Sequence, residues 1–332
     1  MSKFVSLRTA ESVSPKHPDK LCDQISDTIL DAYLAEDREA RVAVEAVGGH
    51  GKVFVTGEVT SSHSVDIEPI VRRIAGDVEV EVRIAKQSPE IAGGVDTGGA
   101  GDQGIMVGYA CSETPELLPL EVVLARSLNQ YLYNLWPYDG KTQVTVSDSD
   151  EIVAIVASFQ NAARGELEGA VKDWARTQRY VSACFVKGRN SNPTLHINPA
   201  GDWNIGGFDA DAGLTGRKLV VDNYGPRIPI GGGCYSGKDP SKVDRSAAYM
   251  ARSLAVEYLG RFQAKEVYVY LAYAIGYDQP VEVTAIVDGV PKAVEGHDLS
   301  PRGIIEALDL KRPIYEETAK YGHYGHAGFS WE

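Results

Sequence analysis

Hydrophobic residues recur every three or four positions in several stretches of the chain, the spacing of helices with one buried face. In the first stretch, from Pro18 to about Ala35, residues Leu21, Ile25, Ile29 and Tyr33 fall on one side of the predicted helix. Its proline stands in the first turn, where a backbone N–H is not needed. The same pattern predicts further helices near 65–75, 119–135, 166–180, 241–259 and 300–308.

Other stretches alternate apolar and polar residues, which predicts half-buried strands. The alternation is clearest in 77–85, where Val78, Val80, Val82 and Ile84 are separated by charged residues. A glycine-rich turn at 48–51 joins two such stretches and indicates a hairpin. The strands predicted elsewhere are 41–47, 52–61, 141–147, 151–159, 194–198, 266–275 and 281–287.

The predicted elements come in the same order three times: helix, two strands, helix. In the first two passages a further strand follows. Consecutive strands joined by a short turn pair antiparallel, and amphipathic helices cover the sheet that the strands form. We therefore expect an α+β fold of three pseudo-repeated units with mixed or antiparallel sheets covered by helices. Their approximate ranges are 1–90, 98–209 and 211–332.

Composition narrows the class of protein. At 332 residues and 43% hydrophobic content, the chain can bury more than one core. A formal net charge of -13 disfavours a general nucleic-acid surface, which needs clustered Lys and Arg. The four cysteines form no CxxC pair, so neither a disulfide framework nor a structural zinc site is predicted. With no apolar leader and no apolar run long enough to cross a bilayer, we expect a cytoplasmic protein without membrane or nucleic-acid partners.

Residues 231–245, GGGCYSGKDPSKVDR, carry the strongest chemical signal. Glycines let backbone N–H groups converge on an anion, Lys238 and Lys242 add positive charge, and the following helix adds its N-terminal dipole. The segment is typical of a polyphosphate site. Residues 232–238 also match a P-loop, but Asp239 stands where a P-loop has Ser or Thr, and 228–230 is a poor preceding strand. A P-loop and a plain glycine-rich turn stay open as alternatives.

Two further segments carry candidate site residues. His17, Asp19 and Lys20 stand at the start of the first predicted helix, where an Asp is otherwise only a favourable dipole partner. Asp19 and Asp244 both open helices beside basic residues, and two carboxylates that meet phosphate oxygens suit Mg²⁺. The glycine-rich loop 98–104 carries Asp102 and is, taken alone, more typical of a surface turn.

The segments SPKHPDKLCDQISD, GAGDQGIM, GLTGRK and GGGCYSGKDPSKVDRSAAY occur in this order along the chain. Together they resemble the signature segments of the methionine adenosyltransferase (S-adenosylmethionine synthetase) family, and the similarity runs from about Thr9 to Trp331. The resemblance implies three interleaved domains of βαββαβ type, in a homodimer or homotetramer with active sites between subunits. It also implies transfer of the adenosyl group of ATP to the sulfur of L-methionine, with the triphosphate released as phosphate and pyrophosphate.

The resemblance also implies a role for each residue that matches a family motif. Asp19 and Asp244 would hold Mg²⁺, as two ions, and Glu45 would be associated with K⁺. The implied gate over the site is 87–96. The implied catalytic residues are His17, Lys141, Arg217, Lys238 and Lys242. The implied ATP-binding set is His17, Lys20, Asp139, Lys141, Asp202, Trp203, Asp211, Arg217, Lys218, Cys234 and Lys238, and the methionine-binding set is Glu58, Gln87, Asp102, Asp211 and Lys242.

Three positions depart from the family pattern. Asp202 and Trp203 stand where relatives commonly have Arg and Phe, and Cys234 replaces a common Ala. An aspartate side chain directed at a triphosphate would repel it. We therefore expect an ATP contact through the backbone of Asp202 and Trp203, with the Trp203 ring near the purine. A nucleotide-binding homologue without catalysis is the alternative that these departures leave open.

The implied chemistry suits these residue types. The thioether sulfur of methionine has a lone pair and no proton to lose, so attack on the ribose C5′ carbon needs alignment and no general base. The difficult part is the negative charge of the leaving triphosphate, which preorganised Lys, Arg, His and Mg²⁺ would meet.

Overall fold

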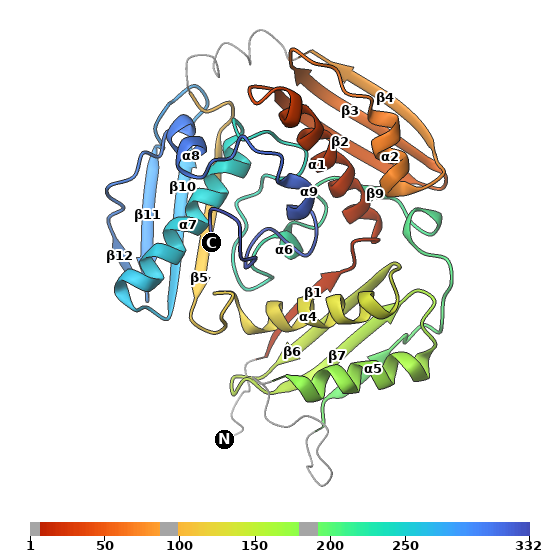
Figure 1. Ribbon diagram of the computed structural model, residues 1–332. Coiled ribbons are helices and arrows are strands. Elements are labelled where there is room, and N and C mark those ends of the chain that lie inside the picture. Colours follow the sequence, from red (N-terminus) through yellow and green to blue (C-terminus); the bar gives the residue numbers. More distant parts are fainter. Residues whose placement is uncertain (1–6, 87–98, 179–191) are drawn as a thin grey trace.

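The computed structural model describes residues 7–86, 99–178 and 192–332. Within them the chain forms three four-stranded sheets with helices packed on them. Figure 1 shows the sheets arranged around a centre that contains α1 (Pro18–Glu36), α6 (Leu219–Asp222) and α9 (Tyr315–Thr318). The predicted α+β fold with three sheets is confirmed. No helix in the described part of the chain is long and apolar enough to span a membrane.

The N-terminal sheet has the strand order β4-β3-β2-β9. Strands β2 (Arg41–Gly49) and β3 (Lys52–Thr60) form an antiparallel hairpin. After the crossover helix α2 (Ile67–Ala75), strand β4 (Glu79–Ala85) lies parallel to β3. The sheet is therefore mixed, with α1 packed against β2.

The central sheet repeats this plan. Strands β6 (Gly140–Val146) and β7 (Ile152–Phe159) form the antiparallel hairpin, and β8 (Thr194–Ile197) lies parallel to β7 after helix α5 (Arg164–Thr177). Helix α4 (Leu120–Leu135) packs on β6 as α1 packs on β2. The repeat predicted from element order is thus present in strand direction as well.

The C-terminal sheet differs at its far edge. Strands β10 (Glu266–Tyr273), β11 (Glu282–Val287) and β12 (Val290–Lys292) form an antiparallel meander, so no parallel strand follows α8 (Pro301–Ala307). Helix α7 (Val243–Phe262) packs on β10. Residues 207–209 add a 3-10 turn, η1 (Gly207–Asp209).

Each sheet takes its fourth strand from another third of the chain. Strand β1 (Arg8–Val13) pairs with β6, β5 (Gly104–Cys111) pairs with β10, and β9 (Gly213–Leu214) pairs with β2, all antiparallel. The first strand of the N-terminal third thus joins the central sheet, that of the central third joins the C-terminal sheet, and that of the C-terminal third joins the N-terminal sheet. The three exchanges link the sheets in a closed ring. None of the three was predicted from the sequence. Strand β5 is almost wholly buried and lacks alternation, and β9 has two residues.

Helix α1 is buried on nearly every side. Its predicted apolar face joins a core that runs through the N-terminal and C-terminal sheets, whereas the central sheet has a separate core under α4 and α5. The opposite face of α1 carries Asp19, Asp23 and Asp27, also buried. Buried carboxylates are costly without partners, and loops from the C-terminal third supply these partners.

Candidate functional site

His17 caps the N-terminus of α1. Its Nδ1 accepts a hydrogen bond from the backbone N–H of Asp19 (3.1 Å), and Pro18 occupies the first helical position. Because Nδ1 is an acceptor, the ring proton lies on Nε2. Burial and the nearby Lys218 lower the pKa of His17 to about 4. The ring is therefore neutral at pH 7 and offers one N–H donor.

Asp19, in the first turn of α1, gathers cations beside His17. It accepts hydrogen bonds from the Leu214 N–H (3.0 Å) and from Lys218 Nζ, and Arg217 Nε lies 3.7 Å from its Oδ1. Burial alone would raise the pKa of Asp19, but the bonds from Lys218 and Leu214 hold it below its ordinary value. The carboxylate is therefore ionised and shared between two cations.

Strand β6 and the turn before it bring Lys141 and Asp139 to the same place. Lys141 is close enough to help lower the pKa of His17, and its Nζ lies 2.7 Å from Glu11 on β1. Asp139 accepts a hydrogen bond from the Gly207 N–H (2.9 Å), and burial, with a contribution from Asp211, raises its pKa. We call this set the histidine cluster: His17, Asp19, Asp139, Lys141, Asp211, Arg217 and Lys218.

A second cluster is built on the lysine-bearing loop before α7. Lys238 Nζ donates to Asp244 (2.6 Å), and Lys242 Nζ donates to Asp239. Glu45 and Glu58, on β2 and β3, line a hollow of about 290 Å³ together with Lys238. Burial opposes the charge of Lys238, but the carboxylates of Asp244 and Asp102 raise its pKa. We call this set the lysine cluster: Glu45, Glu58, Asp102, Cys234, Lys238, Lys242 and Asp244.

The loops of both clusters dock on the same edge of β2. Residues 213–215 bond to residues 46–48 of the strand, and residues 237–239 bond to residues 42–44. The two docking points are four residues apart, about 13 Å at the rise of a strand. The chain between them, 217–236, leaves the sheet edge and returns to it. The two motifs are thus two pieces of one interrupted edge strand.

A row of aspartates on α1 holds both loops from the opposite side. Asp19, Asp23 and Asp27 accept hydrogen bonds from the backbone N–H groups of residues 214, 216 and 237, at 3.0, 2.8 and 2.8 Å. Asp19 and Asp27 are eight residues apart, about 12 Å along a helix. This spacing agrees with the spacing of the docking points on β2. Helix α1 and strand β2 together set the distance between the clusters.

Two glycines are required where the loops dock. Gly237 has a φ of 79°, and a Cβ there would lie 1.9 Å from the Val44 carbonyl oxygen. Gly216 also has a φ of 79°, and a Cβ there would lie 2.6 Å from the Cβ of Cys234. Cys234 therefore packs where the two loops meet, and burial raises the pKa of its thiol. It serves as packing, not as a thiolate.

Lys20 was predicted to bind ATP, and the structure places it in the interior. Its side chain is 1% exposed, with Nζ 2.6 Å from Asp222 and 3.0 Å from Asp23. The two carboxylates raise its pKa against the effect of burial. From this position Lys20 neutralises the buried Asp23 and Asp222, and a contact with ATP stays a prediction.

The sequence did not single out Asp23, Asp27 or Arg245, the partner of Asp27. Arg245 forms a fully buried double hydrogen bond with Asp27, at 2.6 and 3.0 Å. The available signal was the four-residue spacing of Asp19, Asp23, Asp27 and Asp31, which places four carboxylates on one helix face. Such a row is ordinarily a solvated face, and only the fold shows that it is buried.

The side chain of Asp202 is bound to the start of α5. Its Oδ1 accepts hydrogen bonds from the Arg164 N–H (3.0 Å) and from Asn198 Nδ2 (3.1 Å), so it satisfies a free N–H of the first helical turn. Trp203 is half-buried, and its carbonyl accepts from the Asn161 N–H (2.9 Å). An ATP contact at these positions stays a prediction. The placement of the carboxylate leaves the backbone and the Trp203 ring to make it.

Metal binding by this chain would depend on bound substrate as well as on the carboxylates of the protein. In the described residues no group of three or more His, Cys, Asp or Glu is placed to hold an ion. Asp19 and Asp244 lie in different clusters, each beside lysines. This suits Mg²⁺, which is commonly bound through one or two carboxylates plus substrate phosphates. Gln87 and the implied gate 87–96 lie outside the described residues.

A P-loop does not fit the lysine-bearing loop. Residues 223–237, all described, form neither strand nor helix before the lysine. Lys238 instead bridges to Ala43 of β2, and α7 begins only at Val243. A P-loop requires a strand, the glycine loop and a helix in direct succession, so this alternative is wrong.

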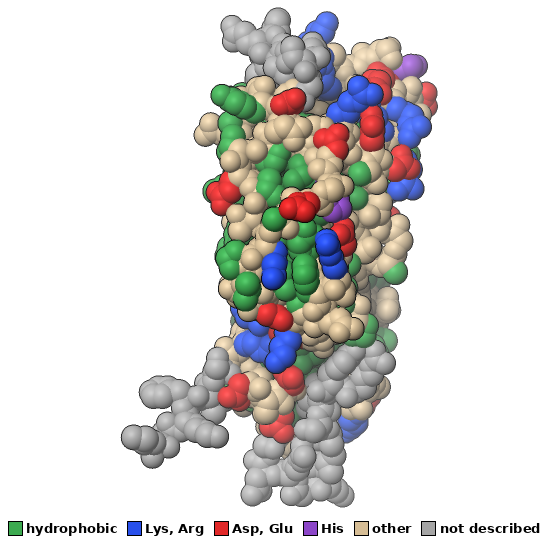
Figure 2. Space-filling view, turned by 90° about the vertical axis from the view of Figure 1, so that its left-hand side faces the viewer, with side chains coloured by type: hydrophobic (Ala, Val, Ile, Leu, Met, Phe, Trp, Pro, Cys, Tyr) green, Lys and Arg blue, Asp and Glu red, His purple; other side chains and the backbone are tan. Residues whose placement is uncertain are grey.

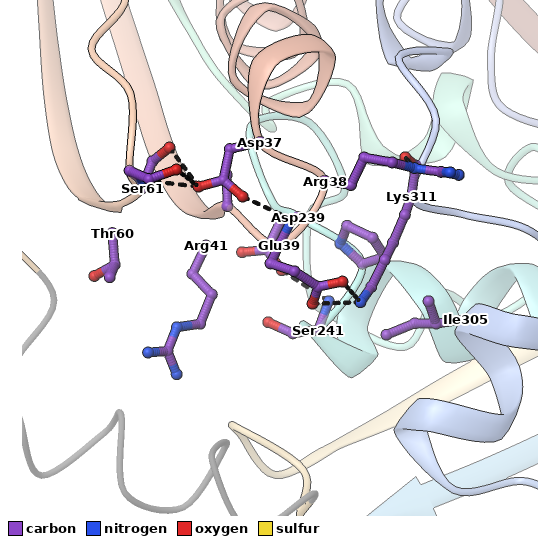
Figure 3. A pocket seen from close by; sticks show the side chains of 13 residues that line it. Asp37, Arg38, Glu39, Arg41, Thr60, Ser61, Asp239, Ser241, Ile305 and Lys311 are labelled. Atoms are coloured by element: carbon purple, nitrogen blue, oxygen red, sulfur yellow. Dashed lines mark hydrogen bonds and ion pairs between the residues drawn. The ribbon is translucent and has the colours of Figure 1, made fainter.

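A polar hollow of about 420 Å³ (Figure 3) is bordered by residues 37–41, 60–62 and 239–241, which include Asp239, the partner of Lys242. At this hollow, Lys311 Nζ donates a hydrogen bond to Glu39 Oε1 at 2.5 Å. Hydrogen bonds from the Ser62 N–H and the Ser61 hydroxyl lower the pKa of Asp37 to about 2. Because these groups already have hydrogen-bond partners, we interpret the hollow as a region of polar contacts that supports the lysine-bearing loop.

Comparison with known proteins gives one consistent result. Models of the N-terminal, central and C-terminal domains of S-adenosylmethionine synthetase match residues 5–91, 97–203 and 205–332. The S-adenosylmethionine synthase of Treponema denticola is 43% identical, over 100% of this chain and 97% of the relative. That of Thermus thermophilus is 42% identical, over 99% and 96%. S-adenosylmethionine synthase 1 of Frankia casuarinae is 44% identical, over 98% and 96%.

Proposed function

Because this chain belongs to the S-adenosylmethionine synthetase family and makes S-adenosylmethionine from ATP and L-methionine, we propose that its histidine and lysine clusters are two halves of one active site. Each site would form between two copies of the chain. One observation carries the proposal: the residues that match the family's motifs divide between two loops, which attach to α1 about 12 Å apart in a single chain. Neither cluster contains the whole set.

The histidine cluster suits the triphosphate of ATP. Lys141, Arg217 and Lys218 carry positive charge, and the neutral His17 offers its Nε2–H without adding charge. These donors are held by α1, β6 and the β9 loop before any ligand arrives, so little reorganisation is needed as the triphosphate leaves. Their task is to stabilise the charge that develops on the leaving group.

The residue types of the lysine cluster suit three tasks: binding of methionine, binding of Mg²⁺, and contact with the end of the triphosphate that lies away from the histidine cluster. Glu58 and Asp102 are carboxylates that can meet the ammonium group of methionine, and Lys238 and Lys242 can turn from their carboxylates to phosphate oxygens. Two Mg²⁺ ions at Asp19 and Asp244, with K⁺ near Glu45, would supply further positive charge against the triphosphate. Methionine sulfur then attacks C5′ without a general base, because it has no proton to lose.

Exposed apolar side chains support a homodimer or homotetramer. Ile105 and Val290 of the C-terminal sheet are 57 and 52% exposed, and Val281, directly before β11, is 60% exposed. Ile275 and Tyr277 are also exposed. Figure 2 shows hydrophobic side chains gathered in the middle of the side of the molecule that carries this sheet. A second copy would cover such a surface. The free thiols Cys22, Cys111 and Cys234 support a reducing, cytoplasmic setting.

The reaction is tested by product analysis. We expect the purified protein, given ATP, L-methionine, Mg²⁺ and K⁺, to form S-adenosylmethionine, phosphate and pyrophosphate in equal amounts, with a lower rate when K⁺ is left out. Hydrolysis of ATP that proceeds equally well without methionine would contradict the proposal. Binding of ATP without turnover would identify the non-catalytic homologue.

A further inference from the structure

A third and larger hollow adjoins the loop that carries His17. It has a volume of about 590 Å³ and lies among the start of α1, the end of α2, the end of α4 and the segment after α9. Pro15 and Lys16, directly before His17, form part of its wall. No residue of the histidine or lysine cluster lines it. Its size falls within the range of small-molecule sites, roughly 300 to 1,000 Å³.

Lys16 contributes a cation to this hollow without a counter-ion. Lys16 is an exposed residue, and its Nζ makes a hydrogen bond of 3.4 Å to the Ile74 carbonyl. Among residues 7–86, 99–178 and 192–332 it forms no ion pair, and partial burial of the ammonium lowers its pKa. An ammonium that lines a hollow and has no carboxylate beside it can donate its protons to an anion. The hollow of Figure 3 shows the contrast, because Lys311 there is paired with Glu39.

Tyr321 contributes a donor without an acceptor. Its hydroxyl oxygen is buried and has no hydrogen-bond partner in the described part of the chain. Buried phenols normally find a partner. Burial and the neighbouring Tyr133 raise the pKa of Tyr321, so the hydroxyl keeps its proton at neutral pH. The ring is held in place by a backbone with a φ of 60°, an uncommon value for a residue other than glycine.

The remaining charges of the lining favour an anion. Arg73 and Lys320 both approach Glu316, at 2.9 and 3.8 Å, and Lys320 also pairs with Glu317. The lining therefore has three cations, including Lys16, and one carboxylate. This local excess of positive charge stands in a chain with a net charge of -13. The apolar part of the wall is Ile74 and the ring of Tyr133.

We infer that this hollow binds a small organic anion, a phosphate or carboxylate group on an aromatic or apolar body. Lys16 Nζ and the Tyr321 hydroxyl donate to the anionic group, and Tyr133 and Ile74 contact the body. The bound anion lies against the backbone directly before His17. The site is additional to the proposed active site, and its existence does not depend on the reaction assigned to the chain.

The test is calorimetric titration of the full chain with phenyl phosphate and with benzoate, which separate a phosphate from a carboxylate preference. We expect Lys16→Gln to weaken binding of the preferred probe by at least about tenfold, since a charged hydrogen bond is lost. Lys238→Gln, in the lysine cluster, and Lys172→Gln, at an exposed pair with Glu168, leave it unchanged. The last variant controls for the loss of one positive charge.

Tyr321→Phe gives an independent arm. Its hydroxyl has no partner to lose, so the thermal midpoint stays at or above the wild-type value, while binding of the probe falls severalfold. Equal affinity of wild type and Lys16→Gln, loss of binding only in Lys238→Gln, or a lowered midpoint with unchanged binding in Tyr321→Phe would each overturn the inference. The second outcome would assign the probe to the active site and leave the proposed reaction untouched.

Discussion

The histidine and lysine clusters attach to the same helix and the same strand, yet they hold their charges differently. In the histidine cluster one carboxylate, Asp19, is shared by Lys218 and Arg217. In the lysine cluster Lys238 and Lys242 each have a carboxylate of their own. At Asp19, two cations therefore face a single carboxylate. In the second cluster each lysine must leave its carboxylate before it can bind a ligand.

This difference distinguishes two kinds of charged cluster that look alike in the sequence. A motif rich in lysine predicts a phosphate site wherever it occurs, because charge and glycine content are all that the sequence displays. The pairing in three dimensions shows which lysines are available before a ligand binds. The following substitutions are ordered by the size of the effect that we expect on this comparison.

Asp27→Asn should have the largest effect, on stability. It breaks the buried pair with Arg245 and weakens the bond to the Gly237 N–H, so the free energy of unfolding in urea should fall by about 3 to 5 kcal/mol. The control is Glu168→Gln, which breaks a solvent-screened pair with Lys172 and should leave the free energy of unfolding nearly unchanged. Equal losses in the two variants would mean that α1 does not hold the lysine-bearing loop through Asp27.

Asp19→Asn and Asp244→Asn should reduce kcat by about 100-fold to 1,000-fold, equivalent to about 2.7 to 4 kcal/mol. Each replaces a carboxylate that we propose as a ligand of Mg²⁺ by a neutral amide. Asp19→Asn should be the more damaging, because it also leaves Lys218 and Arg217 without their shared carboxylate. Asp209→Asn, an exposed position, is the control. Near-wild-type product formation at sub-saturating Mg²⁺ would remove either residue from the metal site.

Asp31 tests how burial along α1 affects stability. It accepts hydrogen bonds from the N–H groups of Tyr315 and Glu316, yet burial raises its pKa to about 7. The folded state therefore keeps a proton that the unfolded state has lost between about pH 4 and pH 7, so this group lowers stability as pH rises through that window. At pH 8, Asp31→Asn should be more stable than the wild type by about 1 to 3 kcal/mol. Unfolding curves of the two proteins that stay parallel from pH 4 to pH 8 would contradict this.

Asp202 and Trp203 should show the smallest effects. Asp202→Ala removes the hydrogen bond at the start of α5, about 1 kcal/mol of stability, and should change the KM for ATP less than about tenfold. Trp203→Ala should weaken ATP binding more than Asp202→Ala does, because the ring is lost. Steady-state kinetics in which Asp202→Ala raises KM more than Trp203→Ala would show that the carboxylate acts on ATP directly.

The predictable part of the fold is its local part. The helices and hairpins followed from periodicity, since each buries one face whatever its neighbours are. Strands β1, β5 and β9 were missed because each pairs with a distant third of the chain. Arg8, for example, pairs in register with Val146. No local sequence pattern indicates which distant strand will be the partner.

The site shows the same limit. The residues could be named from motifs, but not which of them share a cluster, since Glu45 and Asp19 stand on consecutive elements and belong to different halves. The burial of Lys20 could not be predicted, because the sequence does not say which side of α1 is buried. Asp23 and Asp27 were missed because a row of acids is usually a surface.

The central claim, that one active site combines the two clusters from different subunits, is tested most directly by mixing inactive subunits. His17→Asn, which keeps an acceptor for the α1 cap, and Lys242→Gln should each abolish most activity alone. Carrying different affinity tags, they can be co-expressed and the mixed dimer isolated. If sites form between subunits, one site of the mixed dimer contains both substitutions and the other neither, so about half of the wild-type activity returns. If the mixed dimer is as inactive as its parents, each chain holds a complete site and the account is contradicted.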